Sequence, residues 1–123
     1  KECGLLGISG VSNDMRSVTE AAENDNEDAK LALEMYADRI AKYIADYYVE
    51  LEGNVDAIVF TAGVLENGSE RREDIMNRLS CLGVKIDKEA NDNIASWKKY
   101  REGVVSSSDS KIRCEVVAYR SYQ

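Results

Sequence analysis

The sequence has no proline and no histidine among its 123 residues, and it contains one tryptophan and one phenylalanine. Without histidine the chain cannot form a Ser-His-Asp or Cys-His catalytic pair or an HExxH metal motif. Its three cysteines, Cys3, Cys81 and Cys114, are far apart and lack CxxC spacing, so neither a zinc site nor a disulfide framework is expected. The cysteines are expected to be reduced thiols of a cytoplasmic protein.

Long apolar runs and an excess of positive charge are also missing. No apolar run approaches the roughly 18 residues that a membrane helix needs, and the N-terminus lacks the pattern of a signal peptide. The chain has 16 Lys and Arg against 23 Asp and Glu, and the resulting charge of −7 repels phosphate backbones. Basic pairs such as Arg71-Arg72 and Lys98-Lys99 are expected on solvated helix faces. Neither a membrane nor a nucleic acid is therefore an expected partner.

The remaining composition is that of a soluble globular protein, with 44% apolar and 32% charged residues. No linker, low-complexity segment or internal repeat divides the chain, so residues 1–123 are expected to belong to one domain. Because the first residue is Lys1 and not Met, the chain is expected to be a fragment of a longer protein.

Hydrophobic spacing predicts alternating helices and strands. Helices are expected at residues 14–22 and 26–51, the second with apolar residues three and four apart and Gly53 at its end. Residues 56–61 are a continuous apolar, β-branched run, typical of a strand covered on both faces in a parallel sheet. After it we expect a helix at 70–81 capped by Ser69 and stopped by Gly83, a brief strand at 84–86, a helix at 87–95 and a strand at 111–118.

This order predicts an α/β fold in which helices cover a sheet. Residues 4–13 contain three glycines and are expected to be an irregular loop or a short strand and turn. A buried strand at 56–61 needs neighbours, and few strands precede the long helix. The first strands of the sheet are therefore expected upstream of this chain.

Two segments could carry a ligand site. The turn after the strand at 56–61 offers Gly63, where a ligand can approach the backbone, and Asn67, a donor and acceptor. An ordinary strand-to-helix turn is the alternative. At the start of the first helix, Asp14 can accept from a hydroxyl, Met15 can lie against a base, and Arg16 can bind ribose or phosphate oxygens. A capped helix with an exposed arginine is the alternative there.

With their surroundings, these segments resemble the acetate kinase family. The resemblance begins with GLLGISG at 4–10 and SNDMR at 12–16, and further blocks follow in the family's order and spacing. These blocks are AKLALEM at 29–35, RIAKYI at 39–44, VDAIVFTAG at 55–63, EN at 66–67, Arg71, and LGVKID at 82–87.

The resemblance implies part of a ribonuclease-H-like domain with a mixed sheet, in an enzyme that transfers the γ-phosphoryl group of ATP to acetate. It also implies ATP or ADP and magnesium as cofactors, and a homodimer. Asp14, Met15 and Arg16 would correspond to a nucleotide contact of the family. The loop that encloses the adenosine would be Gly63, Val64, Leu65, Glu66 and Asn67. The family's catalytic arginines, histidine and acetate pocket would lie upstream, so no catalytic or metal residue is assigned here and the chain alone is expected to be inactive.

Two departures from the family pattern stand out. The family loop usually reads Gly-Ile-Gly-Glu-Asn, whereas here Leu65 replaces the second glycine. The family's last strand leads into an Asn-Glu-Glu-like segment that helps to hold magnesium, whereas residues 118–123 read AYRSYQ. A non-catalytic interaction domain derived from the kinase is therefore one alternative. A propionate or butyrate kinase is another, because the pocket that selects the acyl chain would lie outside this chain.

Overall fold

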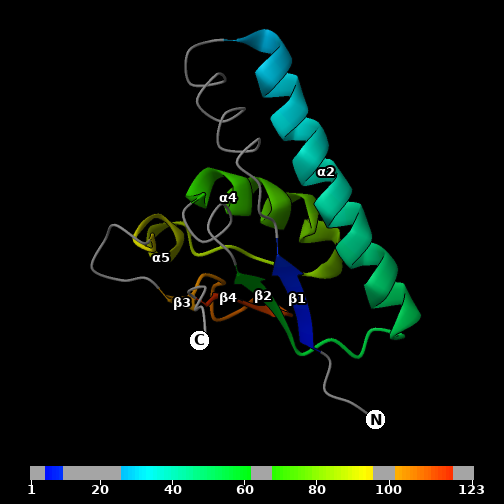
Figure 1. Cartoon of the computed structure of the whole chain (residues 1–123). Helices are drawn as coiled ribbons and strands as arrows, with labels where there is room; N and C mark the ends of the chain where they lie inside the picture. Colours follow the sequence, from blue (N-terminus) through cyan, green and yellow to red (C-terminus); the bar gives the residue numbers. More distant parts are fainter. Residues whose placement is uncertain (1–4, 10–25, 62–67, 96–101, 118–123) are drawn as a thin grey trace, which may run out of the picture.

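The computed structural model describes residues 5–9, 26–61, 68–95 and 102–117. Its four strands form one sheet in the order β1-β2-β4-β3, in which β1, β2 and β4 are parallel and β3 is antiparallel to β4 (Figure 1). The strands are β1 (Leu5–Ser9), β2 (Ala57–Thr61), β3 (Gly103–Val104) and β4 (Arg113–Val116). The predicted α/β fold with a mixed sheet is confirmed, and the segment at 4–13 contains a strand.

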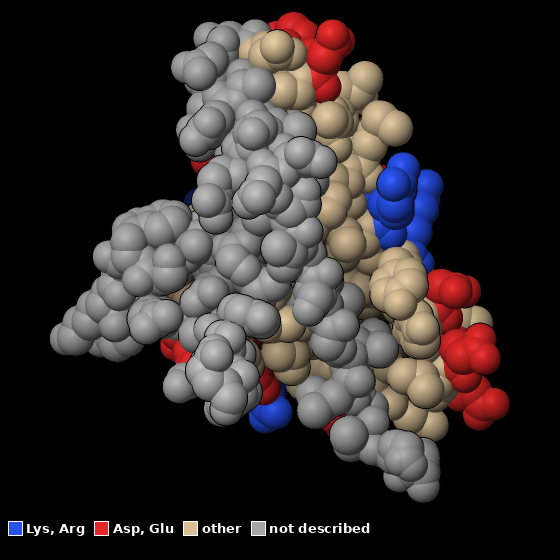
Figure 2. Space-filling view, viewed as in Figure 1, with Lys and Arg blue, Asp and Glu red and all other residues tan. Residues whose placement is uncertain are grey.

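Helix α2 (Glu27–Glu50) confirms the long helix predicted at 26–51. Asn26 caps its start, because its Oδ1 accepts from the amide of Ala29 at 2.9 Å. Acidic side chains lie at both ends of α2, with basic side chains between them (Figure 2). Neither α2 nor any other described helix has the apolar stretch that crossing a membrane requires. The buried stripe of α2 consists of Ala29, Leu33, Ala37, Ala41 and Ile44.

Strand β2 lies inside the sheet, as predicted for residues 56–61. Ile58 and Phe60 are fully buried on one of its faces, where they share a core with α2 and α4 (Ser69–Arg78). On the opposite face, Ala57 is fully buried, whereas Val59 and Thr61 are only half-buried. Within the described ranges, the prediction of a strand covered on both faces is therefore confirmed for one face and only in part for the other.

The helix predicted at 70–81 is divided into α4 and the short 3-10 helix η1 (Ser80–Leu82). Ile75, Met76 and Leu79 point inward as predicted, and all three are buried. Ser69 is not the N-cap, because that position is Gly68 and Ser69 is the first helical residue.

The predicted helix at 87–95 is shorter in the structure, where α5 covers Lys88–Asp92. Asp87 caps it by accepting from the amide of Ala90 at 3.1 Å. The last strand is also shorter than predicted, since β4 spans four residues of the range 111–118. The helix predicted at 14–22 lies outside the described residues.

The strand predicted at 84–86 is wrong, because only an isolated bridge between Ile86 and Ser106 forms there. Two backbone hydrogen bonds form this bridge: the amide of Ser107 donates to the carbonyl of Lys85 at 2.9 Å, and the amide of Asp87 donates to the carbonyl of Val105 at 2.8 Å. Gly83 permits a close approach by Lys111, whose amide donates to the carbonyl of Gly83 at 2.8 Å. The φ of Gly83 is 90°, and a Cβ at this position would lie 2.7 Å from Cβ of Lys111.

Candidate functional site

The parallel strands β1, β2 and β4 end at one edge of the sheet. Ser9 at the end of β1 is the register partner of Thr61 at the end of β2, and Phe60 is the partner of Val116 at the end of β4. Beyond β4, the amide of Val117 donates to the carbonyl of Phe60 at 2.9 Å. In α/β sheets this carboxyl edge is the usual place for a ligand. We therefore take it as the candidate site.

The residues predicted to bind the ligand lie outside the described residues. They are Asp14, Met15, Arg16, Gly63, Val64, Leu65, Glu66 and Asn67. The described strands nevertheless bear on the prediction that the two segments lie close together, because one follows β1 and the other follows β2. Ser9 and Thr61 are neighbours across these strands, while the proximity of the segments themselves stays a prediction.

Helix α4 begins directly after the second predicted segment. Its N-cap residue is Gly68, which has no side chain to accept from the first turn, and the amide of Arg72 donates to the carbonyl of Gly68 at 2.9 Å. The first amides of a helix have no partner within the helix and attract anions. The acidic residue in this turn, Glu70, pairs with Arg71 through an oxygen and a nitrogen 3.4 Å apart.

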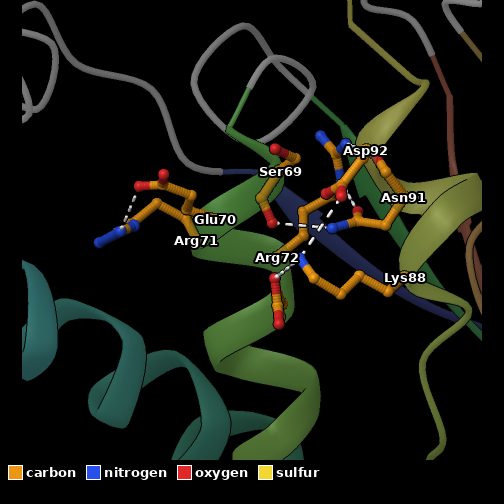
Figure 3. A network of polar contacts seen from close by, with 8 residues as sticks. Ser69, Glu70, Arg71, Arg72, Lys88, Asn91 and Asp92 are labelled. Atoms are coloured by element: carbon orange, nitrogen blue, oxygen red, sulfur yellow. Dashed lines mark hydrogen bonds and ion pairs between the residues drawn. The ribbon is translucent and has the colours of Figure 1, made fainter.

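A buried polar network holds this first turn of α4 against α5 (Figure 3). Arg72 is fully buried, and its guanidinium donates to Oδ1 of Asn91 at 2.7 Å, to the carbonyl of Asn91 at 3.0 Å and to the carbonyl of Ile94 at 2.9 Å. Asn91 is equally buried and donates from Nδ2 to the carbonyl of Ser69 at 2.9 Å. Buried polar groups are costly unless they are bonded, so this network fixes the relative positions of the two helices.

Ion pairs on the surface surround the network. Nζ of Lys88 lies 3.1 Å from Glu73 and 3.4 Å from Asp92, and hydrogen bonds to Glu73 and then Asp92 raise the pKa of Lys88. Exposed pairs of this kind contribute little to stability. Among the described residues, no group of three His, Cys, Asp or Glu side chains is placed to hold a metal ion.

Arg72 and Asn91 are not among the site residues that the sequence predicts. The pair Arg71-Arg72 was expected on a solvated helix face, and this expectation is wrong for Arg72, which has no exposed surface. One signal was available. Arg72 precedes Ile75 by three residues and Met76 by four, so helical spacing places it on the same inward face as these buried side chains.

Comparisons with known proteins agree with one another. The chain matches the model of the acetokinase family over residues 1–120. It is 45% identical over 117 residues to the acetate kinase of Halothermothrix orenii, a match that covers 95% of this chain and 28% of that protein. The structure of Porphyromonas gingivalis acetate kinase is similar with a TM-score of 0.75 and 38% identity, over 90% of this chain and 27% of that one.

A propionate kinase from Francisella tularensis has a similar structure, with a TM-score of 0.73 and 34% identity, over 86% of this chain and 25% of that one. The chain thus spans little more than a quarter of the length of the acetate kinases that it matches.

Proposed function

The chain belongs to the acetokinase family, and we propose that it is the nucleotide-binding part of an acetate kinase that transfers the γ-phosphoryl group of ATP to acetate. Its fold is accordingly the ribonuclease-H-like fold of acetate kinases. The complete reaction would need the remaining length of the relatives, so the chain by itself is expected to bind nucleotide without turning it over.

The register pairing of Ser9 with Thr61 is the observation that carries this proposal. The two segments that resemble nucleotide contacts of the family each follow one of these neighbouring residues. A nucleotide needs groups from more than one segment, because base, ribose and phosphates differ in chemistry. Two segments that leave the same edge of a sheet side by side are suited to supply them.

Each proposed contact has a chemical role. The carboxylate of Asp14 accepts from a ribose hydroxyl, the side chain of Met15 lies against the base, and the guanidinium of Arg16 binds ribose or phosphate oxygens. The loop from Gly63 to Asn67 encloses the adenosine. The amides at the uncapped start of α4 favour negative charge nearby.

The chemistry of the proposed reaction is chiefly positioning and charge neutralisation. Magnesium, when bound, neutralises charge on the phosphates. The described residues gather no metal-holding cluster, and we propose that its ligands belong largely to the rest of the protein. For the same reason no catalytic residue is assigned to this chain, which would contribute the grip on the nucleotide.

Calorimetric titration of the chain with ADP and magnesium tests the proposed binding. Saturable binding with one site is expected, and an Arg16→Gln variant should bind more weakly because it loses the cationic contact. Lys42→Gln on the exposed side of α2 is the control for loss of one positive charge. Absence of binding by the unaltered chain would favour the alternative of a non-catalytic interaction domain.

The similarity to a propionate kinase makes that activity the second candidate. Selectivity for the acyl chain would come from a pocket outside this chain, so the described residues do not separate the two substrates. Phosphoryl transfer by the complete protein should be measured with acetate, propionate and butyrate. The highest kcat/KM with acetate is expected, and a preference for a longer acid would replace this assignment.

We also propose that the protein is a cytoplasmic homodimer. In the described part of the sheet, β1 has a neighbour on one side only, and α2 exposes Leu31, Met35 and Val49. An open strand edge and exposed apolar side chains both favour association. Light scattering over a range of concentrations should give a dimer mass, and a monomer mass throughout would contradict the proposal.

A further inference from the structure

Arg72 and Asn91 form a closed circuit of hydrogen bonds between α4 and α5. The guanidinium of Arg72 donates to Asn91 Oδ1 at 2.7 Å, and the same amide group donates from Nδ2 to the carbonyl of Ser69 at 2.9 Å (Figure 3). The oxygen and the nitrogen of the Asn91 side-chain amide therefore both bond residues of α4. The bonds reach residues 69 and 72, so they hold the first turn of the helix and no other part of it.

Packing does not require this circuit. The inward face of α4 already carries Ile75, Met76 and Leu79, all of them buried. An arginine with no exposed surface loses its hydration, and apolar residues of similar volume are often as stable or more stable at such positions. Hydrogen bonds have a defined geometry, so the circuit fixes how the first turn of α4 is rotated about its axis and shifted along it, relative to α5.

We propose that Arg72 and Asn91 are positioning residues for the bound nucleotide, acting through the start of α4. The proposal rests on the proposed nucleotide-binding function. Ser69, whose carbonyl Asn91 holds, is two residues after Asn67, the last residue of the proposed adenosine loop. The circuit thus holds Ser69, and the chain runs from Ser69 through Gly68 to the C-terminal end of that loop.

A second connection runs toward α5. Arg72 also donates to the carbonyls of Asn91 and Ile94, at 3.0 Å and 2.9 Å, which lie at the end of α5 and just beyond it. The same guanidinium therefore ties the start of α4 to the point where α5 ends. A shift of either helix would break bonds at a fully buried group, which leaves polar atoms without partners.

The sharpest test is Asn91→Asp in the complete protein that carries this chain. The carboxylate keeps an acceptor for Arg72 but has no donor for the carbonyl of Ser69. The folded state should persist, because the guanidinium of Arg72 then pairs with a carboxylate in place of a neutral amide oxygen. The Kd for ADP with magnesium should rise about 2- to 10-fold, the effect of one hydrogen bond. The KM for the carboxylate substrate should not change.

Two further variants separate positioning from charge and from unfolding. Asn93→Asp makes the same substitution at the exposed end of α5 and should leave the Kd for ADP unchanged. Asn91→Ser removes the amide donor to the carbonyl of Ser69 without burying a carboxylate. It tests the positioning role if Asn91→Asp does not fold. As a local readout, hydrogen exchange at the amide of Arg72, which bonds Gly68 at 2.9 Å, should be faster in either Asn91 variant.

The outcomes are distinguishable. Loss of ADP affinity in the Asn91 variants but not in Asn93→Asp supports the proposal. A folded Asn91 variant whose Kd for ADP lies within the error of the unaltered protein overturns it and leaves the proposed function standing. If the unaltered protein itself binds no ADP, the proposed function fails, and the positioning role fails with it before any variant is made.

Discussion

Helix α2 ends in a Schellman turn whose left-handed residue is Glu52. The amide of Glu52 bonds the carbonyl of Val49 at 2.9 Å, the amide of Gly53 bonds the carbonyl of Tyr48 at 2.9 Å, and φ of Glu52 is 56°. Glycine is the usual residue at this position, because a Cβ is disfavoured there by about 1–2 kcal/mol. We predict that Glu52→Gly raises the free energy of unfolding.

The size of this effect follows from two opposing contributions. Relief of the left-handed strain is partly offset by the greater freedom of glycine in the unfolded chain, about 0.5–1 kcal/mol. The expected net gain is about 0.5–1 kcal/mol, or a rise in Tm of about 2–5 °C. The last turn of α2 has no basic residue, and acidic side chains gather at this end (Figure 2). Removing a carboxylate next to the negative helix terminus acts in the same direction.

Urea and thermal unfolding followed by circular dichroism, at several protein concentrations, measure the change. Glu52→Ala removes the carboxylate and keeps the Cβ, so it isolates the contribution of charge. Gly53→Ala is the opposite control: φ of Gly53 is 80° and its Cβ would lie 3.4 Å from Oη of Tyr48, so a loss of about 1 kcal/mol is expected. If Glu52→Gly is no more stable than Glu52→Ala, the backbone at Glu52 is not strained and the reasoning is refuted.

Three other predictions concern the loop, the thiols and acid stability. Leu65→Gly restores the glycine that the family usually has and should lower the Kd for ADP in a calorimetric titration; an unchanged or higher Kd would show that Leu65 does not hinder binding. Burial raises the pKa of Cys114 to about 12, whereas Cys81 is exposed. Iodoacetamide should therefore modify Cys81 in the folded chain and Cys114 only in denaturant. Mass spectrometry of the peptides measures this, and modification of Cys114 in the folded chain would contradict the prediction. The hydrogen bond from Ser107 lowers the pKa of Asp109 below 3.8, so its contribution to stability is present above that pH and is lost as pH falls through the lowered value. Asp109→Asn should consequently lose less stability than the unaltered chain on acidification, and equal slopes of unfolding free energy against pH would contradict this.

Elements whose local pattern agrees with their burial could be predicted from the sequence. In α2, Leu33 and Ile44 belong to a stripe of three-four spacing, and both are buried. In β2, the apolar run around Ile58 and Phe60 predicts an interior strand, and both side chains have no exposed surface. These signals are strong because the period of the pattern and the chemistry of its residues indicate the same element.

Predictions failed where distant contacts decide which backbone groups pair. Residues 84–86 have the composition of a strand, but their pairing with the segment between β3 and β4 is limited to the single bridge between Ile86 and Ser106. β1 could be predicted only as a loop or a short strand, because Gly7 weakens the local strand signal and its partner β2 lies some fifty residues later. Ser69 is a good capping residue, yet the helix begins one residue earlier than predicted, at Ser69 itself, with Gly68 as its N-cap. The propensities of neighbouring residues do not determine which of these backbone groups pair or where the helix begins.

The candidate site shows the same division. Arg71 and Arg72 are adjacent and chemically identical, but successive side chains of a helix point in directions about 100° apart. The two side chains therefore have different surroundings. Arg72 enters the buried network with Asn91, whereas the Arg71 side chain is 16% exposed and pairs with the exposed Glu70. The partner of Arg72 lies 19 residues away, so the sequence can suggest that Arg72 points inward but cannot identify what it bonds.

The binding segments and their support can therefore be tested separately. SNDMR and the Gly63 to Asn67 loop were each weak signals, and their resemblance to the family gives them meaning. The start of α4, by contrast, is held by bonds of 2.7–3.0 Å that the sequence did not predict. These bonds do not involve Leu65. If the unaltered chain binds ADP weakly while the Leu65→Gly variant binds it tightly, the side chain of Leu65 is the cause of the weak binding. Both chains could instead bind ADP weakly while the amides of Arg72 and Asn91 are protected from hydrogen exchange. The start of α4 would then be held in place, and we would expect the missing affinity to come from the remaining length of the protein.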